Sequence, residues 1–119
     1  MDDQITPNFK LSEFACGCGQ CINLVEPDLI HRLQKVRDVY RKPMTVTSGY
    51  RCPEHNLAVG GAKGSYHMRG LAADIAASSP KDKYQIIHAA MAVGFWGIGV
   101  ASWGVHLDLR KTTPVVFTY

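Results

Sequence analysis

Residues 49–70 form a long glycine-rich segment that leads directly into the apolar run LAADIAA, residues 71–77. Irregular segments of this length are uncommon within a compact domain and are often functional. The apolar run predicts a buried strand, yet it carries a carboxylate, Asp74, at its centre. Because an unpaired buried carboxylate is very costly, Asp74 needs a partner close to this strand, and a metal ion is one such partner.

The flanking segments predict a small domain with helices and strands. Residues 27–40 carry apolar side chains at helical spacing, and residues 79–94 begin with a Ser-Pro capping pattern and end at a glycine. Four short runs predict strands: residues 44–48, 71–77, 96–100 and 104–110. We therefore expect an α+β fold, in which a small antiparallel β-sheet packs against helices.

Size and charge exclude several classes of protein. With 119 residues, 46% of them hydrophobic, the chain is expected to form one domain, residues 1–119, which includes a cysteine-rich segment, residues 1–22. The formal net charge of +3 suits an anionic partner such as a cell-wall polymer but not a nucleic acid, which would require a clustered basic stripe. No apolar run approaches the ~18 residues of a membrane span, so no membrane insertion is expected. Residues 1–10 have no apolar core of a signal peptide, which predicts synthesis in the cytoplasm.

Two histidines and the strand carboxylate are candidate metal ligands. His67 precedes the strand that carries Asp74, and His106 lies in a later predicted strand. Two neutral imidazoles and one carboxylate would leave a bound Zn²⁺ with net positive charge and an open position, as in a catalytic zinc site. On spacing alone a simpler alternative stays open, in which Asp74 pairs with Arg51 or Arg69 and the histidines are ordinary core residues.

Two motifs carry a resemblance to a known family. The pattern S-x-H-x-x-G-x-A-x-D occupies residues 65–74, and a G-x-H-x-D segment occupies residues 104–108. Together they resemble the M15 family of zinc D,D- and L,D-peptidases, which shares its fold with the signalling domain of Hedgehog proteins. The resemblance covers residues 8–110 and implies a Hedgehog/DD-peptidase-like fold. It also implies a Zn²⁺ cofactor held by His67, Asp74 and His106, and peptide stems of bacterial peptidoglycan as substrates.

The same resemblance assigns a role to Arg51, in the motif SGYR. It matches the arginine that steadies the substrate carbonyl and its developing oxyanion in the family. A fixed cation beside a metal contributes most when negative charge develops. The alternative is a surface arginine that pairs with an acid.

One position departs from the family pattern. Several members place an acid three residues before the last histidine ligand, as general base, and here that position is Trp103. Asp108 is expected on the same strand face as His106, because side chains alternate with period two. It could be the catalytic base, a group that orients a ligand, or an acid paired with Arg110. Further candidates for the base lie in the glycine-rich segment: Glu54 and His55.

The four cysteines allow several disulfide or metal-binding arrangements. Cys16, Cys18 and Cys21 form a C-x-C-x-x-C cluster, and Cys52 follows Arg51. They could form two disulfides, one disulfide with two free thiols, or a second, structural zinc site. Cytoplasmic synthesis favours reduced thiols or a metal.

The function predicted from these features is a zinc metallopeptidase that cuts peptidoglycan stems at a D-Ala–D-Ala or L-Ala–D-Glu bond. The absent signal sequence suggests an endolysin-like enzyme that acts on the cell wall after phage-type release, and we expect a monomer. The missing acid at the position of Trp103 keeps an alternative open: a non-catalytic or weakly catalytic module that binds peptidoglycan.

Overall fold

A computed structural model describes residues 3–119 of the chain, so residues 1–2 of the predicted domain and of its N-terminal segment lie outside the described residues. The helices are η1 (Leu11–Phe14), α1 (Pro27–Tyr40), α2 (Pro53–Ala58), η2 (Tyr66–Arg69) and α3 (Pro80–Val93). The strands are β1 (Gln4–Thr6), β2 (Phe9–Lys10), β3 (Val46–Ser48), β4 (Ala72–Ala76), β5 (Gly97–Ala101), β6 (Gly104–Asp108) and β7 (Val115–Thr118). Among the described helices, none is long and apolar enough to cross a membrane.

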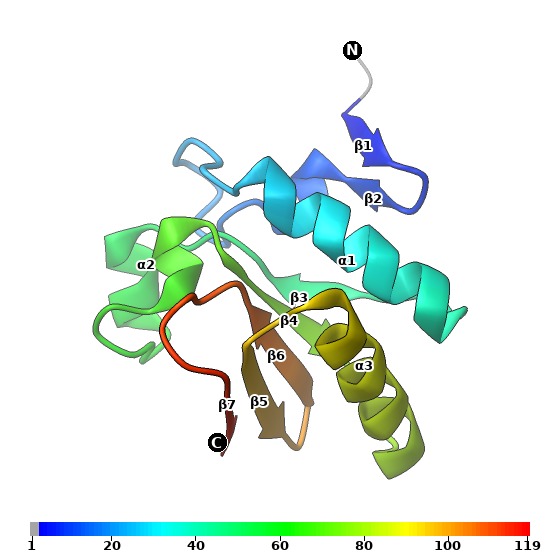
Figure 1. The fold of residues 1–119 in the computed structure, drawn as a ribbon. Helices are drawn as coiled ribbons and strands as arrows, with labels where there is room; N and C mark the ends of the chain where they lie inside the picture. Colours follow the sequence, from blue (N-terminus) through cyan, green and yellow to red (C-terminus); the bar gives the residue numbers. More distant parts are fainter. Residues whose placement is uncertain (1–2) are drawn as a thin grey trace.

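A five-stranded sheet, in the order β3-β4-β6-β5-β7, forms the centre of the fold, and β1 and β2 form a separate hairpin. Neighbouring strands of the central sheet run antiparallel, except that β7 runs parallel to β5. Figure 1 shows α1 and α3 together on one side of this sheet, with α2 apart from them. The predicted α+β class is therefore confirmed. The parallel edge strand β7 was not predicted from the sequence.

The two long helices follow the predicted signals. Helix α1 spans the predicted residues and has its proline at the first turn, where no intrahelical bond is lost. At the start of α3 the Ser79 hydroxyl accepts a bond from the Asp82 backbone N–H at 3.0 Å. The helix ends at Gly94, whose φ of 102° is a left-handed conformation that glycine adopts without a steric penalty. Both helices bury apolar side chains against the sheet: Leu29, Ile30, Leu33 and Val36 from α1, and Ile86, Ala89 and Ala90 from α3.

The central strands β4 and β6 have two chemically different faces. The face toward α1 and α3 carries core residues: Ala73, Ile75, Val105 and Leu107. The alternate positions carry Asp74, His106 and Asp108, because successive side chains of a strand point to opposite faces. On that side His67, from the segment between β3 and β4, contacts Asp74, and Phe117 of β7 lies beside His106.

That segment is less irregular than the sequence predicted. Within residues 49–70 the chain forms the short helix α2, which begins at Pro53, and the 3₁₀ turn η2. The Ser65 hydroxyl caps η2 by accepting a bond from the backbone N–H of His67 at 3.2 Å. This cap fixes the backbone of His67 and directs its side chain toward the sheet, where it is buried.

Candidate active site

One row of residues crosses all five strands on the face of the sheet that lies opposite α1 and α3. Ser48 of β3 lies opposite Asp74 of β4, and Asp74 lies opposite His106 of β6. The row continues through Gly99 of β5 to Phe117 of β7. Directly opposed residues of neighbouring strands share a face, so the pairing alone places the carboxylate beside the imidazole.

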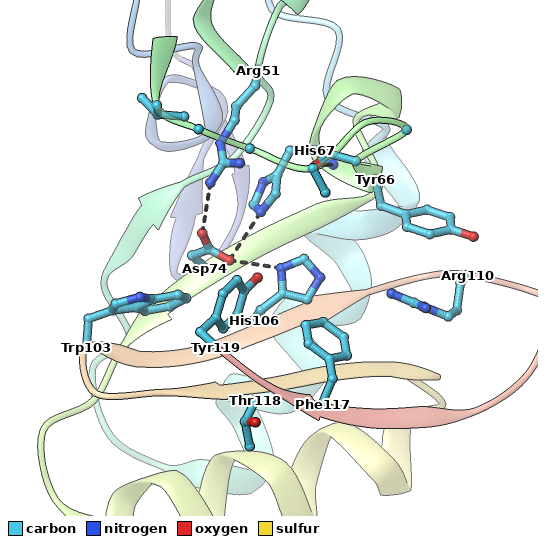
Figure 2. Close-up of a pocket in the computed structure, with 16 residues that line it drawn as sticks. Arg51, Tyr66, His67, Asp74, Trp103, His106, Arg110, Phe117, Thr118 and Tyr119 are labelled. Atoms are coloured by element: carbon cyan, nitrogen blue, oxygen red, sulfur yellow. Dashed lines mark hydrogen bonds and ion pairs between the residues drawn. The ribbon is translucent and has the colours of Figure 1, made fainter. Parts of the chain in front are cut away.

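The three predicted metal ligands come together over this row. Asp74 Oδ1 lies 3.2 Å from His67 Nε2 and 3.0 Å from His106 Nδ1. All three side chains are buried, with exposures of 2% for His67 and 5% for each of the other two residues. Tetrahedral zinc with nitrogen and oxygen ligands at about 2.0–2.1 Å holds neighbouring ligand atoms about 3.3 Å apart. The observed separations are close to this value, so the donor set fits a zinc ion (Figure 2).

Asp74 and Asp108, the two carboxylates on this face of β4 and β6, both have lowered pKa values. Burial alone would raise the pKa of Asp74, but the contacts with His106 and His67, which stabilise the ionised form when those rings carry a proton on the facing nitrogen, outweigh it and lower the pKa to about 2. Burial acts in the same direction on Asp108, but bonds from Arg110 and His106 hold the pKa of that carboxyl well below its usual range. Each group is therefore available at neutral pH as an acceptor, and Asp74 also as an anionic ligand.

Neighbouring acceptors fix the tautomers of the two histidines. His67 Nδ1 lies 2.8 Å from the Gly49 carbonyl oxygen, and His106 Nε2 lies 2.8 Å from Asp108 Oδ2. A carbonyl and an ionised carboxylate can only accept, so these two ring nitrogens donate. In the neutral imidazoles the lone pairs of His67 Nε2 and His106 Nδ1 then face Asp74 Oδ1. Three electron-rich atoms pointing at one another repel, and a cation among them removes that repulsion.

Arg51 lies directly beside this ligand set. Its Nη2 donates to Asp74 Oδ2 at 3.2 Å, its Nε to Ser48 Oγ at 3.1 Å and its Nη1 to Asn56 Oδ1 at 3.3 Å. The side chain is 16% exposed. The arginine is therefore held at three nitrogens, and one carboxylate oxygen of Asp74 is left to the histidines while the other accepts from Arg51.

Asp108 lies behind His106 and away from solvent. Its Oδ1 accepts from Arg110 Nε at 2.9 Å, and its Oδ2 accepts from Arg110 Nη2 at 2.7 Å and from His106. Gly97 of β5 lies opposite, and a Cβ at that position would overlap the carboxylate of Asp108. The carboxylate is fully buried and is absent from the wall of the adjoining pocket.

A pocket of about 600 Å³ opens over the three ligands. Residues 59–62 and 64–66 form one side. The aromatic side chains of Trp103, Phe117 and Tyr119 form the other, as Figure 2 shows. The lining side chains named in that view are Arg51, Tyr66, His67, Asp74, Trp103, His106, Arg110, Phe117, Thr118 and Tyr119. Asp74 is the one carboxylate in this wall among the described residues, since neither Glu54 nor Asp108 reaches it. His55 also lies elsewhere, with its ring beside Gly17.

The sequence reading missed the contribution of β7. The Phe117 ring centroid lies 5.4 Å from that of His106, and Tyr119 lies 5.5 Å from Trp103 and 5.7 Å from Phe117. Figure 2 shows the Tyr119 hydroxyl directed toward the Asp74 carboxylate. The alternation in VVFT, with Phe117 half-buried between exposed residues, is the one sequence signal that could have indicated this strand.

The four cysteines gather away from this pocket. Cys52 Sγ lies 3.7 Å from Cys16 Sγ and 3.9 Å from Cys18 Sγ. All four sulfur atoms, including that of Cys21, lie within 4.8 Å of one another, and none of the four is joined in a disulfide.

Comparison with known proteins agrees with this architecture. The crystal structure of the L-Ala D-Glu endopeptidase ChiX of Serratia marcescens matches with a TM-score of 0.53 and 21% identity, over 73% of this chain and 81% of that chain. At this identity the match shows a common fold. The sequence model of the peptidase M15 family matches residues 7–108, and the chain belongs to this family, as the motifs predicted. A search of curated proteins gave no match.

Proposed function

We propose that the chain is a zinc-dependent peptidase that hydrolyses peptide bonds in the peptide stems of bacterial peptidoglycan. The observation that carries this proposal is the convergence of three buried donor atoms, with fixed tautomers, beneath an open pocket and beside Arg51. Membership of the peptidase M15 family supports hydrolysis of a peptide bond. The fold shared with a L-Ala D-Glu endopeptidase supports the choice of peptidoglycan and makes that bond the first to test.

The zinc ligands in this proposal are His67 through Nε2, Asp74 through Oδ1 and His106 through Nδ1. When bound, zinc supplies Lewis acidity that polarises a carbonyl and lowers the pKa of water. The Gly49 carbonyl and the Asp108 carboxylate keep the ligating nitrogens free of protons, because each holds the proton on the other ring nitrogen.

Arg51 is assigned to the developing negative charge of the reaction. Its guanidinium lines the pocket next to Asp74 and is held by Ser48 and Asn56, so it needs no reorganisation when charge forms. A cation that is fixed in advance stabilises a transition state more than a mobile one does. The ion pair with Asp74 is compatible with this role, since Asp74 Oδ2 takes only one of the guanidinium nitrogens.

Asp108 is assigned to orienting His106 and not to proton transfer. A general base must reach the proton that it removes, within hydrogen-bond distance or through one water. Both oxygens of Asp108 already accept from Arg110, one of them also accepts from His106, and neither lines the pocket. Of the three predicted roles, the geometry favours the orienting role together with the ion pair to Arg110.

The pocket also suits the proposed substrate. Arg51 and Arg110 line it, so it presents positive charge to the carboxylates of stem peptides, and Tyr66, Phe117 and Tyr119 provide apolar contact for their alkyl groups. Burial raises the pKa of the Tyr119 hydroxyl above its usual value, so this group is protonated at neutral pH and can donate a hydrogen bond within the pocket.

A second candidate function is a module that binds peptidoglycan without cutting it. One specific observation favours it: Trp103 lines the pocket at the position where several family members have an acid, and no side-chain carboxylate of residues 3–119 other than Asp74 reaches the pocket wall.

The deciding experiment incubates purified, zinc-loaded protein with purified sacculi and identifies released fragments by mass spectrometry. Release of stem fragments that stops with a chelator and returns with zinc supports the peptidase. Sedimentation with sacculi from several wall types, without any fragments, would instead establish the binding module.

A further inference from the structure

The four cysteines lie where the N-terminal segment meets the chain between β3 and α2. We propose that Cys16, Cys18, Cys21 and Cys52 bind a second zinc ion, which is structural and fastens these two segments together. This proposal does not depend on the catalytic assignment of the first site.

The spacing of the sulfur atoms carries the proposal. Tetrahedral zinc with thiolate ligands at about 2.3 Å holds neighbouring sulfur atoms about 3.8 Å apart. Cys52 Sγ lies 3.7 Å from Cys16 Sγ and 3.9 Å from Cys18 Sγ, and the set is completed by Cys21 within 4.8 Å. Two of the distances match this value and all four sulfur atoms lie within 4.8 Å of one another, so they are close enough to share one zinc ion.

The same distances argue against disulfides. A disulfide joins one pair of sulfur atoms at about 2.05 Å and directs the other cysteines elsewhere. Here Cys52 Sγ has two neighbours, the sulfur atoms of Cys16 and Cys18, at nearly equal distance, and neither is singled out as its partner. A disulfide between Cys52 and either of these neighbours would draw its sulfur atom away from the other.

Backbone groups around the sulfur atoms suit thiolates. The Cys52 N–H donates to Cys16 Sγ and the Gln20 N–H donates to Cys18 Sγ, each at 3.4 Å. Such N–H···S bonds stabilise negative charge on metal-bound sulfur and orient it. Gly19, with a φ of 72°, lets the chain turn back between Cys18 and Cys21, so that both side chains point to one centre.

Four sulfur ligands leave no open coordination position, and none of the four cysteines lines the active-site pocket. A closed Cys₄ zinc site contributes to folding and not to chemistry. Cys52 directly follows Arg51 in the chain, and the Tyr50 N–H donates to the Phe14 carbonyl at 2.8 Å. The zinc would therefore fix the chain immediately beside Arg51, a consequence for catalysis that rests on the proposed function above.

Metal analysis of the whole chain tests the proposal. Protein purified under reducing conditions should contain two zinc ions per chain, and the His106→Ala variant should retain one. X-ray absorption at the zinc edge of that variant should show only sulfur ligands, at about 2.3 Å. Nitrogen or oxygen ligands in the retained site, or no retained zinc, would overturn the proposal. If the wild type holds one zinc that His106→Ala keeps with sulfur ligands, the cysteine site stands and the catalytic site fails.

Variants of the cysteines give an independent check. Cys21→Ser replaces the most exposed ligand and should lower the zinc content by one ion per chain. The matched control is His55→Ala, which removes the imidazole beside Gly17 and should leave the zinc content unchanged. If Cys21→Ser retains both ions, or if four thiols of the metal-loaded wild type react at once with a thiol reagent and release no zinc, the proposal is wrong. Should Cys21→Ser fail to fold, the absorption spectrum of His106→Ala still decides.

Discussion

The two clusters of metal-binding side chains differ in how the chain builds them. His67, Asp74 and His106 are set mainly by the sheet, where strand pairing places Asp74 opposite His106. Cys16, Cys18 and Cys21 lie in the loop between η1 and α1, and Cys52 directly precedes α2, so no strand pairing sets their spacing. The first cluster has three donors beneath a pocket, whereas the second has four donors and no pocket.

This difference separates reactivity from stability. A catalytic metal site needs an open coordination position for substrate or water. Its protein ligands must stay in place when substrate replaces water at that position. Strands packed on a core provide that rigidity. A site that only holds segments together needs all its positions filled by the protein, and it can draw them from loops, because the metal itself orders them. The predictions below test this division, from the largest expected loss of activity to the smallest.

Removal of a sheet-borne ligand should have the largest effect. His106→Ala should lower kcat/KM by at least about 10³-fold, because the Lewis acidity of a metal ion is worth several kcal/mol. Activity is measured by fragment release from sacculi, and folding by circular dichroism. The control is His88→Ala, an exposed position on α3 that should retain full activity. Equal activity of both variants would show that the sheet cluster is not the reactive site.

Arg51 should come next. Arg51→Ala should lower kcat/KM by about 10²–10³-fold, the usual cost of losing a group that stabilises an oxyanion. Arg51→Lys should restore little, because an ammonium cannot reproduce the fork that contacts Ser48, Asn56 and Asp74. Zinc content should stay constant in both variants, and Arg69→Ala, an exposed arginine nearby, serves as control. Loss of zinc together with activity would mean that Arg51 acts only by holding Asp74.

Asp108→Asn distinguishes orientation from proton transfer. If Asp108 orients His106, zinc affinity or activity should fall by about 10–100-fold, and the pH profile of the zinc-saturated variant should keep its shape. Loss of a general base would instead cost about 10²–10⁴-fold at unchanged zinc affinity and remove the acidic limb of the profile. Zinc affinity is measured by competition with a chromogenic chelator. Asp28→Asn, on the exposed face of α1, is the control.

The cysteine cluster should matter least for turnover. Cys21→Ser should lower kcat/KM by less than about tenfold, a loss of under about 1.4 kcal/mol, because the cluster affects the reaction only through the chain beside Arg51. Its thermal midpoint should fall much more clearly than that of Arg51→Ala. A loss of activity as large as that of His106→Ala, with folding intact, would contradict the division between a reactive and a structural cluster.

Local signals were enough to predict much of the fold. Helix α1 has the predicted bounds, and α3 begins at its predicted serine cap, because apolar periodicity and capping are properties of neighbouring residues. Helix α2 was missed because it is mostly exposed: Asn56 is its one buried residue, so no apolar stripe marks it. Strand β7 was missed because its pairing partner β5 lies far away in the sequence and half of its side chains are exposed.

The candidate site was less predictable from residues alone. Spacing left open whether Asp74 binds a metal or pairs with Arg51, and the structure brings all of these groups together around one carboxylate. The shared face of His106 and Asp108 followed from strand alternation. The complete burial of Asp108 did not, because it depends on Gly97 in another strand.

Strand β5 contributes no ligand and no charged group, yet it shapes the site because two of its residues, Gly97 and Gly99, have no side chain. A Cβ at Gly97 would occupy the place of the Asp108 carboxylate, and one at Gly99 would lie 2.6 Å from the Phe117 ring and 2.9 Å from the Tyr119 ring. Saturation mutagenesis would therefore record these two glycines as intolerant, while Ile98 between them accepts other apolar residues of similar volume. Mutational data alone would therefore group both glycines with the reactive residues, although their role is to leave room for the side chains of Asp108, Phe117 and Tyr119.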